Sequence, residues 1–235
     1  MSVGRRLEQL AVQYALSPAA VGALERLLEA LTAQPSAPTA VRDPARAVDT
    51  HVADALVALD VAPVRAARRI ADLGAGAGLP GLVLAAALPE ADVSLVESNR
   101  RKCEFIACAA SQMRLGNVAV VAERAESWRA GIGVHDLVTA RALAPLPVLV
   151  EYAAPLLAPG GALLAWKGRR SEDEEADGIA AAAATGLELA EVRAVRPWDG
   201  AERLHLHLYL KVGDTPSRFP RRPGMASKRP LRASG

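Results

Sequence analysis

A glycine-rich segment in the first half of the chain constrains the fold more than any other feature. Residues 70–81 read Ile-Ala-Asp-Leu-Gly-Ala-Gly-Ala-Gly-Leu-Pro-Gly, an apolar run that turns into glycines and then into a predicted helix over Leu79–Leu88. Glycine tolerates positive φ and lets a ligand approach the backbone closely, and the free amides of the following helix start face the same place. The segment therefore predicts a strand, a turn and a helix, with a ligand at the turn.

The rest of the chain alternates short apolar runs with helical stretches. This alternation is typical of a parallel sheet whose two faces are covered by helices. The last two runs leave little room for a helix between them, so they predict an antiparallel hairpin. The predicted strands are Arg69–Leu73, Asp92–Glu97, Val118–Val121, Asp136–Ala140, Ala162–Trp166, Leu187–Val195 and Leu204–Val212, and the other predicted helices are Asn99–Met113, Pro147–Leu157 and one that begins at Ser171. We expect an α/β fold with a mostly parallel, seven-stranded sheet.

The two ends of the chain differ in composition from this central region. Residues 1–62 are predicted to be helical, with helix-start signals at Ser17-Pro18 and Asp43-Pro44. Residues 214–235 contain six basic residues, one acid and four prolines, so they predict a flexible basic tail without secondary structure. We therefore expect three parts: a helical region over 1–62, an α/β domain over 63–213 and a tail over 214–235.

Composition argues against several classes of protein. The longest apolar stretch, Leu79–Leu88, is about half of the ~20 residues that a membrane helix needs. The two cysteines, Cys103 and Cys108, lie in one predicted helix and indicate neither a disulfide framework nor a zinc site. Aromatic residues make up only 3% of the chain, which argues against a sheet that stacks RNA bases on exposed rings. We expect a cytoplasmic, metal-independent monomer.

The glycine loop fits two classes of cofactor, and the position of its turn distinguishes them. The pattern Gly76-x-Gly78-x-x-Gly81, with Glu97 about 20 residues later, fits a nicotinamide or flavin dinucleotide. That register would place Asp72 and Gly74 inside a buried strand, which neither residue favours. If the turn opens at Gly74 instead, the Asp72 carboxylate lies beside the ligand, where it attracts an ammonium group and repels a pyrophosphate.

An acid before Gly74-x-Gly76-x-Gly78 is what S-adenosylmethionine needs, because the amino acid part of this cofactor carries an ammonium group. Glu97, at the end of the second predicted strand, can accept hydrogen bonds from both ribose hydroxyls. The sequence therefore favours S-adenosylmethionine, with Asp72, Gly74, Gly76, Gly78 and Glu97 as contacts. A dinucleotide site, or glycines that serve only to pack the strand against the helix, are the alternatives.

The chain resembles the small-subunit ribosomal RNA methyltransferase G family over nearly its whole length and in order. The strongest resemblance is the string Asp72–Cys103, which contains the glycine loop and Leu-Val-Glu-Ser-Asn-Arg-Arg-Lys at 95–102. Further similar segments are Thr39–Pro44 with His51 and Asp54, Glu123–Glu126, Thr139–Ala142, Trp166–Gly168, and Arg218–Gly224 with Lys228–Leu231. One departure is Ala37-Pro38-Thr39, where family members commonly have Asn-Leu-Thr.

The resemblance implies a class I, Rossmann-like methyltransferase fold with a small amino-terminal helical addition. The implied reaction is transfer of a methyl group from S-adenosylmethionine to N7 of a guanine in a loop of 16S ribosomal RNA. The resemblance also implies cofactor contacts at Gly74, Leu79, Ala125, Glu126 and Arg141.

Methylation at guanine N7 makes few chemical demands on the protein. N7 carries a lone pair and no proton, so the reaction needs placement of the base and no general base. Arg124, Lys167 and Arg203 are candidates to position the RNA, because each lies near the end of a predicted strand or in the loop after one. The basic tail is expected to neutralise phosphates. Two other functions stay open: a methyltransferase for a small molecule, and a non-catalytic RNA-binding or assembly protein on the same fold.

Overall fold

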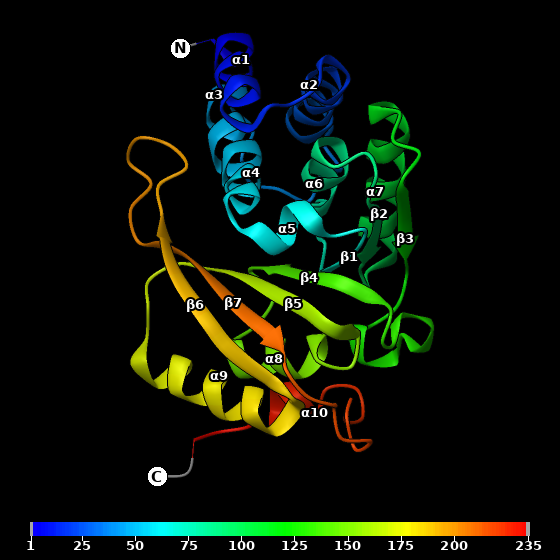
Figure 1. Ribbon diagram of the computed structural model, residues 1–235. Coiled ribbons are helices and arrows are strands. Elements are labelled where there is room, and N and C mark those ends of the chain that lie inside the picture. Colours follow the sequence, from blue (N-terminus) through cyan, green and yellow to red (C-terminus); the bar gives the residue numbers. More distant parts are fainter. Residues whose placement is uncertain (1, 234–235) are drawn as a thin grey trace.

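The computed structural model describes residues 2–233, which form one sheet between two layers of helices (Figure 1). The sheet has seven strands in the order β3-β2-β1-β4-β5-β7-β6. The first five strands are parallel, and β7 runs antiparallel to both of its neighbours, β5 and β6. The strands are β1 (Arg69–Leu73), β2 (Asp92–Val96), β3 (Val118–Val121), β4 (His135–Arg141), β5 (Leu157–Lys167), β6 (Leu187–Val195) and β7 (Leu204–Lys211). The predicted α/β fold with its antiparallel carboxyl-terminal pair is confirmed.

One helix and the strand after it differ in length from the prediction. The helix α8 (Leu146–Ala153) ends at Ala153 rather than at Leu157, because Pro155 has no amide hydrogen to continue the helix. The strand β5 accordingly begins at Leu157 rather than at Ala162, and its added first part pairs with the start of β4 through a register shift.

One face of the sheet is covered by the amino-terminal helices together with α6 and α7, the upper layer of Figure 1. Ser17 and Asp43 cap the helices that follow them, as predicted. One hydrophobic cluster runs from Leu24 in this layer to Leu95 in the sheet, so residues 1–62 share a core with the α/β domain. The elements of this layer are α1 (Val3–Tyr14), α2 (Pro18–Ala33), α3 (Pro44–Ala47), η1 (Val48–Ala53), α4 (Asp54–Leu56), η2 (Val57–Asp60), α5 (Ala62–Ala66), α6 (Gly81–Ala87) and α7 (Arg100–Met113).

The other face is covered by α8 and α9 (Glu172–Thr185), the lower layer of Figure 1. A second hydrophobic cluster joins Leu149 and Ala181 of these helices to Leu73 and Leu163 of the sheet. The short helices η3 (Ala125–Ser127) and η4 (Arg129–Gly131) follow β3 at one end of this layer. In the part of the chain that the structure describes, no helix has both the length and the apolar character that crossing a membrane requires.

The segment after β7 contains structure that the sequence analysis did not predict. It forms a short helix, α10 (Met225–Lys228), which lies next to α8 (Figure 1). The side chains of Phe219 and Ala226 are buried, and Arg221 forms an ion pair with Glu151 of α8. The expectation that this tail lacks secondary structure is therefore wrong, because its few apolar residues pack against the lower layer.

Candidate active site

The glycine loop after β1 lies at the carboxyl ends of the parallel strands. Gly74, Gly76 and Gly78 have φ angles of +63°, +59° and +81°, which residues with a side chain rarely adopt. A Cβ on Gly74 would also lie 2.5 Å from Cδ1 of Leu143. The Gly74 amide donates to the carbonyl of Val96 at 2.8 Å and holds the loop against β2. The turn opens at Gly74, as the sequence predicts.

Asp72, the acid before this loop, lies fully buried beneath it rather than beside an open space. Its Oδ2 accepts a hydrogen bond from the amide of Gly81 at 2.9 Å, and its Oδ1 accepts one from the hydroxyl of Thr139 at 2.9 Å. Burial raises the pKa of this carboxyl to about 7, although both hydrogen bonds oppose the shift. In this structure Asp72 ties the start of α6 to β4 under the loop. The expected contact of its carboxylate with an ammonium group stays a prediction.

Glu97 follows β2 and links the glycine loop to the start of α7. Its Oε2 accepts a hydrogen bond from the amide of Gly76 at 3.1 Å, and its Oε1 accepts one from the amide of Asn99 at 2.8 Å. Asn99 in turn caps α7 with its side-chain oxygen. Two backbone amides therefore hold the nearly buried carboxylate of Glu97 next to the glycine loop.

A hollow of about 340 Å³, which we call the first hollow, opens beside Glu97. It brings together five residues that the sequence analysis singled out: Gly74, Glu97, Arg124, Ala125 and Glu126. Its other lining residues are Val96, Ser98, Lys102, Glu123, Ala142, Leu143 and Tyr152. The carboxylate of Glu126 accepts a hydrogen bond from the amide of Gly224 at 2.9 Å, so the segment after β7 reaches the wall of this hollow.

A second hollow, of about 220 Å³, lies at the carboxyl ends of β4 and β5. Arg141 lines this second hollow and not the first, and its Nη1 donates to Oδ2 of Asp54 at 2.6 Å. Burial raises the pKa of the Asp54 carboxyl, and the guanidinium of Arg141 opposes that shift. Lys167 lies in the same hollow and forms an ion pair with Glu174 at 2.6 Å. The lining residues are Asp54, Arg141, Ala142, Trp166, Lys167, Gly168 and Leu204.

Ala142 lines both hollows, so the two hollows are neighbours. It follows β4 with a φ of +53°, which is uncommon for a residue with a Cβ and is found preferentially at functional sites. Groups bound in the two hollows would therefore lie on either side of the residue that follows β4.

Other residues that the sequence analysis singled out lie around these hollows without lining them. Gly76, Gly78 and Leu79 shape the loop, and Arg203 is an exposed residue with a φ of +64° just before β7. Their roles toward cofactor or substrate stay predictions. Within residues 2–233, the structure shows no group of three or more His, Cys, Asp or Glu side chains that could hold a metal ion.

Asp54 and Trp166 are among the residues of the second hollow that were not predicted as site residues. Asp54 is nearly buried, and the indole Nε1 of Trp166 donates to its carbonyl at 2.8 Å. The sequence does contain a signal for Asp54, because it stands in the apolar run Val-Ala-Asp-Ala-Leu at 52–56. An acid in a predicted helix core needs a partner, and here the partner is Arg141, which is far away in the sequence.

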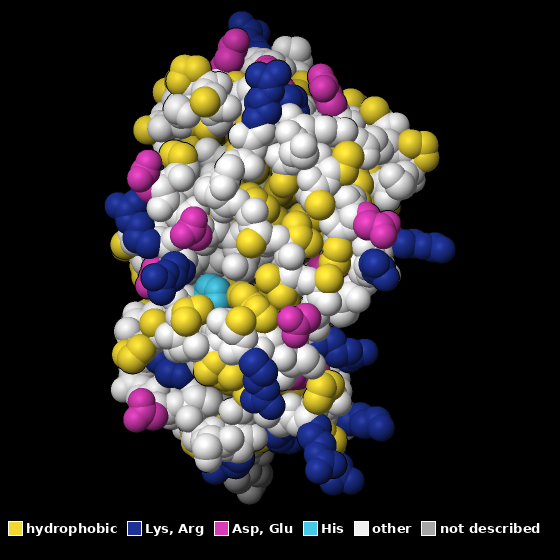
Figure 2. All heavy atoms as spheres, turned by 90° about the vertical axis from the view of Figure 1, so that its right-hand side faces the viewer, with side chains coloured by type: hydrophobic (Ala, Val, Ile, Leu, Met, Phe, Trp, Pro, Cys, Tyr) yellow, Lys and Arg dark blue, Asp and Glu magenta, His cyan; other side chains and the backbone are white. Residues whose placement is uncertain are grey.

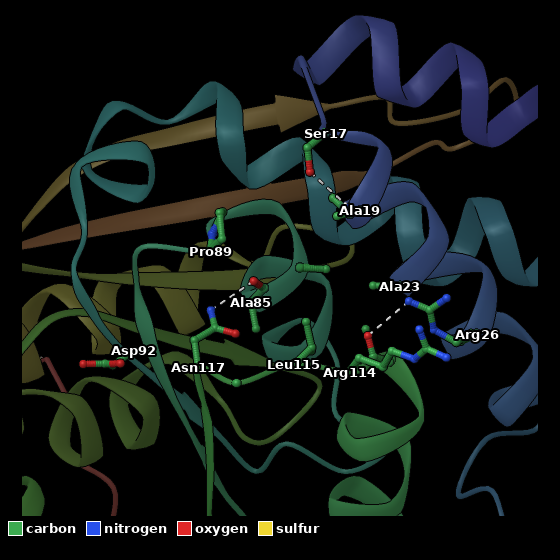
Figure 3. Close-up of a pocket in the computed structure, with 14 residues that line it drawn as sticks. Ser17, Ala19, Ala23, Arg26, Ala85, Pro89, Asp92, Arg114, Leu115 and Asn117 are labelled. Carbon is green, nitrogen blue, oxygen red and sulfur yellow. Dashed lines mark hydrogen bonds between the residues drawn. The ribbon is translucent and has the colours of Figure 1, made fainter.

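A larger hollow, of about 650 Å³, lies at the opposite edge of the sheet (Figure 3). Its wall includes Asp92 at the start of β2 and Asn117 just before β3, so it opens at the amino ends of the strands. Alanines of α2 and α6 line it, with Arg26 and Arg114 at one side. None of the predicted site residues lines this hollow, so volume alone does not identify the site.

Comparison with known proteins identifies the family. A family model described as rRNA small subunit methyltransferase G matches residues 24–203, which include the glycine loop and every residue lining the first hollow. The ribosomal RNA small subunit methyltransferase G of Rubrobacter xylanophilus is 42% identical over 200 residues, covering 83% of this chain and 77% of that protein. The protein of the same name from Thermotoga neapolitana is 38% identical over 207 residues, covering 88% and 89%.

The comparison with solved structures agrees. A predicted O-methyltransferase from Agrobacterium tumefaciens matches with a TM-score of 0.54 and 25% identity, over 70% of this chain and 81% of that one. The chain therefore belongs to the rRNA small subunit methyltransferase G family and is an S-adenosylmethionine-dependent methyltransferase of class I fold.

Proposed function

We propose that this enzyme transfers a methyl group from S-adenosylmethionine in the first hollow to N7 of a guanine of 16S ribosomal RNA in the second. The observation that carries the proposal is the pair of neighbouring hollows that share Ala142. One is lined by Gly74 of the glycine loop and by Glu97, and the other by Asp54 and Lys167. The ribosomal substrate is supported by the names of the relatives, which are ribosomal RNA small subunit methyltransferases.

The first hollow and the glycine loop beside it fit S-adenosylmethionine. The backbone at Gly76 is open, since an added Cβ would meet only the carbonyl oxygen of Gly74, at 3.6 Å, and a ligand can therefore approach the main chain. The carboxylate of Glu97 would accept hydrogen bonds from the ribose hydroxyls, and Ala125 and Glu126 would form further contacts. When bound, the cofactor supplies an electrophilic methyl group. Asp72 supports this site indirectly by fixing the loop from below.

The second hollow offers hydrogen-bonding groups that suit a guanine. Of the residues that line it, only Asp54 has a carboxylate, and a carboxylate can accept hydrogen bonds from both N1–H and the 2-amino group. Adenine has an acceptor at N1 and lacks the 2-amino group, so it would not satisfy Asp54. A donor such as Lys167 directed at O6 would hold the base while the lone pair of N7 stays free to react.

One face of the molecule has the charge that RNA binding requires. Figure 2 shows the right-hand side of Figure 1, and Lys and Arg side chains predominate over the lower half of this face. Arg203 lies in the exposed loop before β7, next to Leu204 of the second hollow. A base in a loop of RNA can reach such a hollow, whereas the deep groove of an RNA duplex keeps N7 out of reach.

The decisive experiment supplies labelled S-adenosylmethionine with three acceptors: deproteinised 16S rRNA, intact small ribosomal subunits and a low-molecular-weight extract. We expect label in 16S rRNA, recovered as 7-methylguanosine, with Arg141→Ala as a folded variant that abolishes transfer. Label only in the small-molecule extract would favour the alternative of a small-molecule methyltransferase. Tight RNA binding without transfer to any acceptor would instead favour an assembly protein on this fold.

We further propose that the enzyme acts in the cytoplasm as a monomer, with residues 1–62, 63–213 and 214–235 as its three parts. Light scattering that gives a mass near 24.6 kDa would support the monomer, and twice that mass would contradict it.

A further inference from the structure

We infer that residues 214–233, which we call the C-terminal strap, are part of the cofactor site and position Glu126 in the wall of the first hollow. This inference rests on the proposed cofactor site, and it assigns the strap a different role from the neutralisation of RNA phosphates that the sequence suggested. Three sets of contacts support it.

The first set anchors the strap to α8 through a partly buried ion pair. Arg221 donates to both carboxylate oxygens of Glu151, with Nε at 2.7 Å from Oε1. The side chain of Glu151 is only 2% exposed, so its charge depends on this partner. Arg221 also donates to the carbonyl of Arg229 at 2.8 Å and thereby links the segments before and after α10. A charge used in this way is not available for a phosphate.

The second set buries the apolar residues of the strap. Phe219 is 7% exposed and Ala226 is 1% exposed, and Ala226 belongs to the hydrophobic cluster of the lower layer. Leu231 packs against the same cluster, and the amide of Ala233 donates to Asp177 of α9 at 2.9 Å. The strap is therefore fixed on both sides of α10.

The third set connects this anchored strap to the first hollow. The amide of Gly224 donates to Oε1 of Glu126 at 2.9 Å, and the hydroxyls of Ser227 and Tyr152 lie 3.2 Å apart. Glu126 and Tyr152 both line the first hollow. Gly224 has a φ of +81°, the left-handed conformation that aims its amide at Glu126. The strap thus determines where one of the proposed cofactor contacts is held.

The test compares two glycines that share the same backbone strain. Gly224→Ala and Gly200→Ala each place a Cβ in open space at a φ of +81° or +87°, so neither creates a clash and both disfavour the native turn. Only Gly224 donates to Glu126. We expect Gly224→Ala to weaken the binding of S-adenosylmethionine to the RNA-free protein about tenfold or more, and Gly200→Ala to leave it within about twofold. Calorimetry measures the affinity, and circular dichroism confirms that both variants are folded.

A second pair of variants distinguishes the loss of the ion pair that anchors the strap from the loss of a positive charge alone. Arg221→Gln and Arg222→Gln remove the same charge from neighbouring residues, but only Arg221 is paired with Glu151. We expect Arg221→Gln to weaken cofactor binding and Arg222→Gln to preserve it. If an anchored strap favours cofactor binding, then bound cofactor must favour the anchored strap to the same extent. The cofactor should therefore slow hydrogen exchange at the Gly224 amide in the unchanged protein.

Two results would overturn the inference. One is cofactor affinity equal to that of the unchanged protein in folded Gly224→Ala. The other is an equal loss of affinity in the Gly200→Ala and Arg222→Gln controls, which would make the effect unspecific. Failure of the proposed cofactor site is recognised separately, because Glu97→Ala would then bind S-adenosylmethionine as tightly as the unchanged protein.

Discussion

Replacing Asp72 by asparagine removes a buried carboxyl that titrates near neutral pH, and the effect on stability can be worked out from its surroundings. Burial raises the pKa of Asp72 from 3.8 to about 7. The folded protein therefore holds this proton more tightly than the unfolded chain does. The carboxyl favours folding most at low pH, and its contribution is lost as the pH rises from about 4 through about 7.

The size of this effect follows from the two pKa values. A difference of about three pH units corresponds to roughly 4 kcal/mol in the free energy of unfolding over the whole range. Between pH 5 and pH 8 the contribution should fall by roughly 2 to 3 kcal/mol. Asparagine is neutral throughout this range. Its Oδ1 can accept from the Gly81 amide and its Nδ2 can donate to the Thr139 hydroxyl, so the variant keeps both links.

The assay is urea denaturation of Asp72→Asn and the unchanged protein at pH 5 and pH 8. We expect the free energy of unfolding of Asp72→Asn, relative to the unchanged protein, to increase by roughly 2 to 3 kcal/mol between these two pH values. Asp92→Asn, at an exposed position at the start of β2, controls for the removal of one carboxylate. The same stability difference for Asp72→Asn at both pH values would refute the reasoning, because it would mean that the buried carboxyl does not titrate in this range.

Three further predictions concern the loop, the cofactor and the RNA. Gly81→Ala should lower the free energy of unfolding by about 1–3 kcal/mol, because its Cβ would lie 2.2 Å from Cδ2 of Leu95; a variant as stable as the unchanged protein in urea would contradict this packing. Glu97→Ala should weaken the binding of S-adenosylmethionine about tenfold to a hundredfold in calorimetry, since a charged hydrogen-bond acceptor is lost. Arg203→Met should leave cofactor affinity unchanged and reduce the salt dependence of 16S rRNA binding by about one counterion; an identical salt slope would exclude Arg203 from the interface.

Local sequence patterns were enough to predict the loop and most of the secondary structure. The strand over Arg69–Leu73 and the turn at Gly74 follow from an apolar run that meets glycines, and both are set by residues adjacent in the chain. The helix starts after Ser17 and Asp43 were predictable for the same reason, since a capping side chain acts on the next few amides.

The side-chain partners within the site depend on contacts between residues far apart in the sequence, which local patterns cannot predict. Asp54 and Arg141 lie 87 residues apart, and Glu126 and Gly224 lie 98 residues apart, so no window of the sequence contains either pair. The burial of Asp72 is another such case. Its position at the end of β1 was predicted, but the direction of its carboxylate depends on the small size of Gly81 and on the hydroxyl of Thr139 in a different strand.

The place of β7 inside the sheet has a consequence for biosynthesis. β7 is the last strand to be made, yet it fills the position between β5 and β6. While a ribosome is still synthesising residues 204–211, the β5 backbone groups that will pair with β7 can form no native hydrogen bonds on that side. A nascent chain that stalls before β7 therefore presents an unpaired edge next to the apolar side chains of Leu163 and Leu164, and such an edge readily joins another chain. The enzyme cannot complete its sheet until residues 204–211 have been translated.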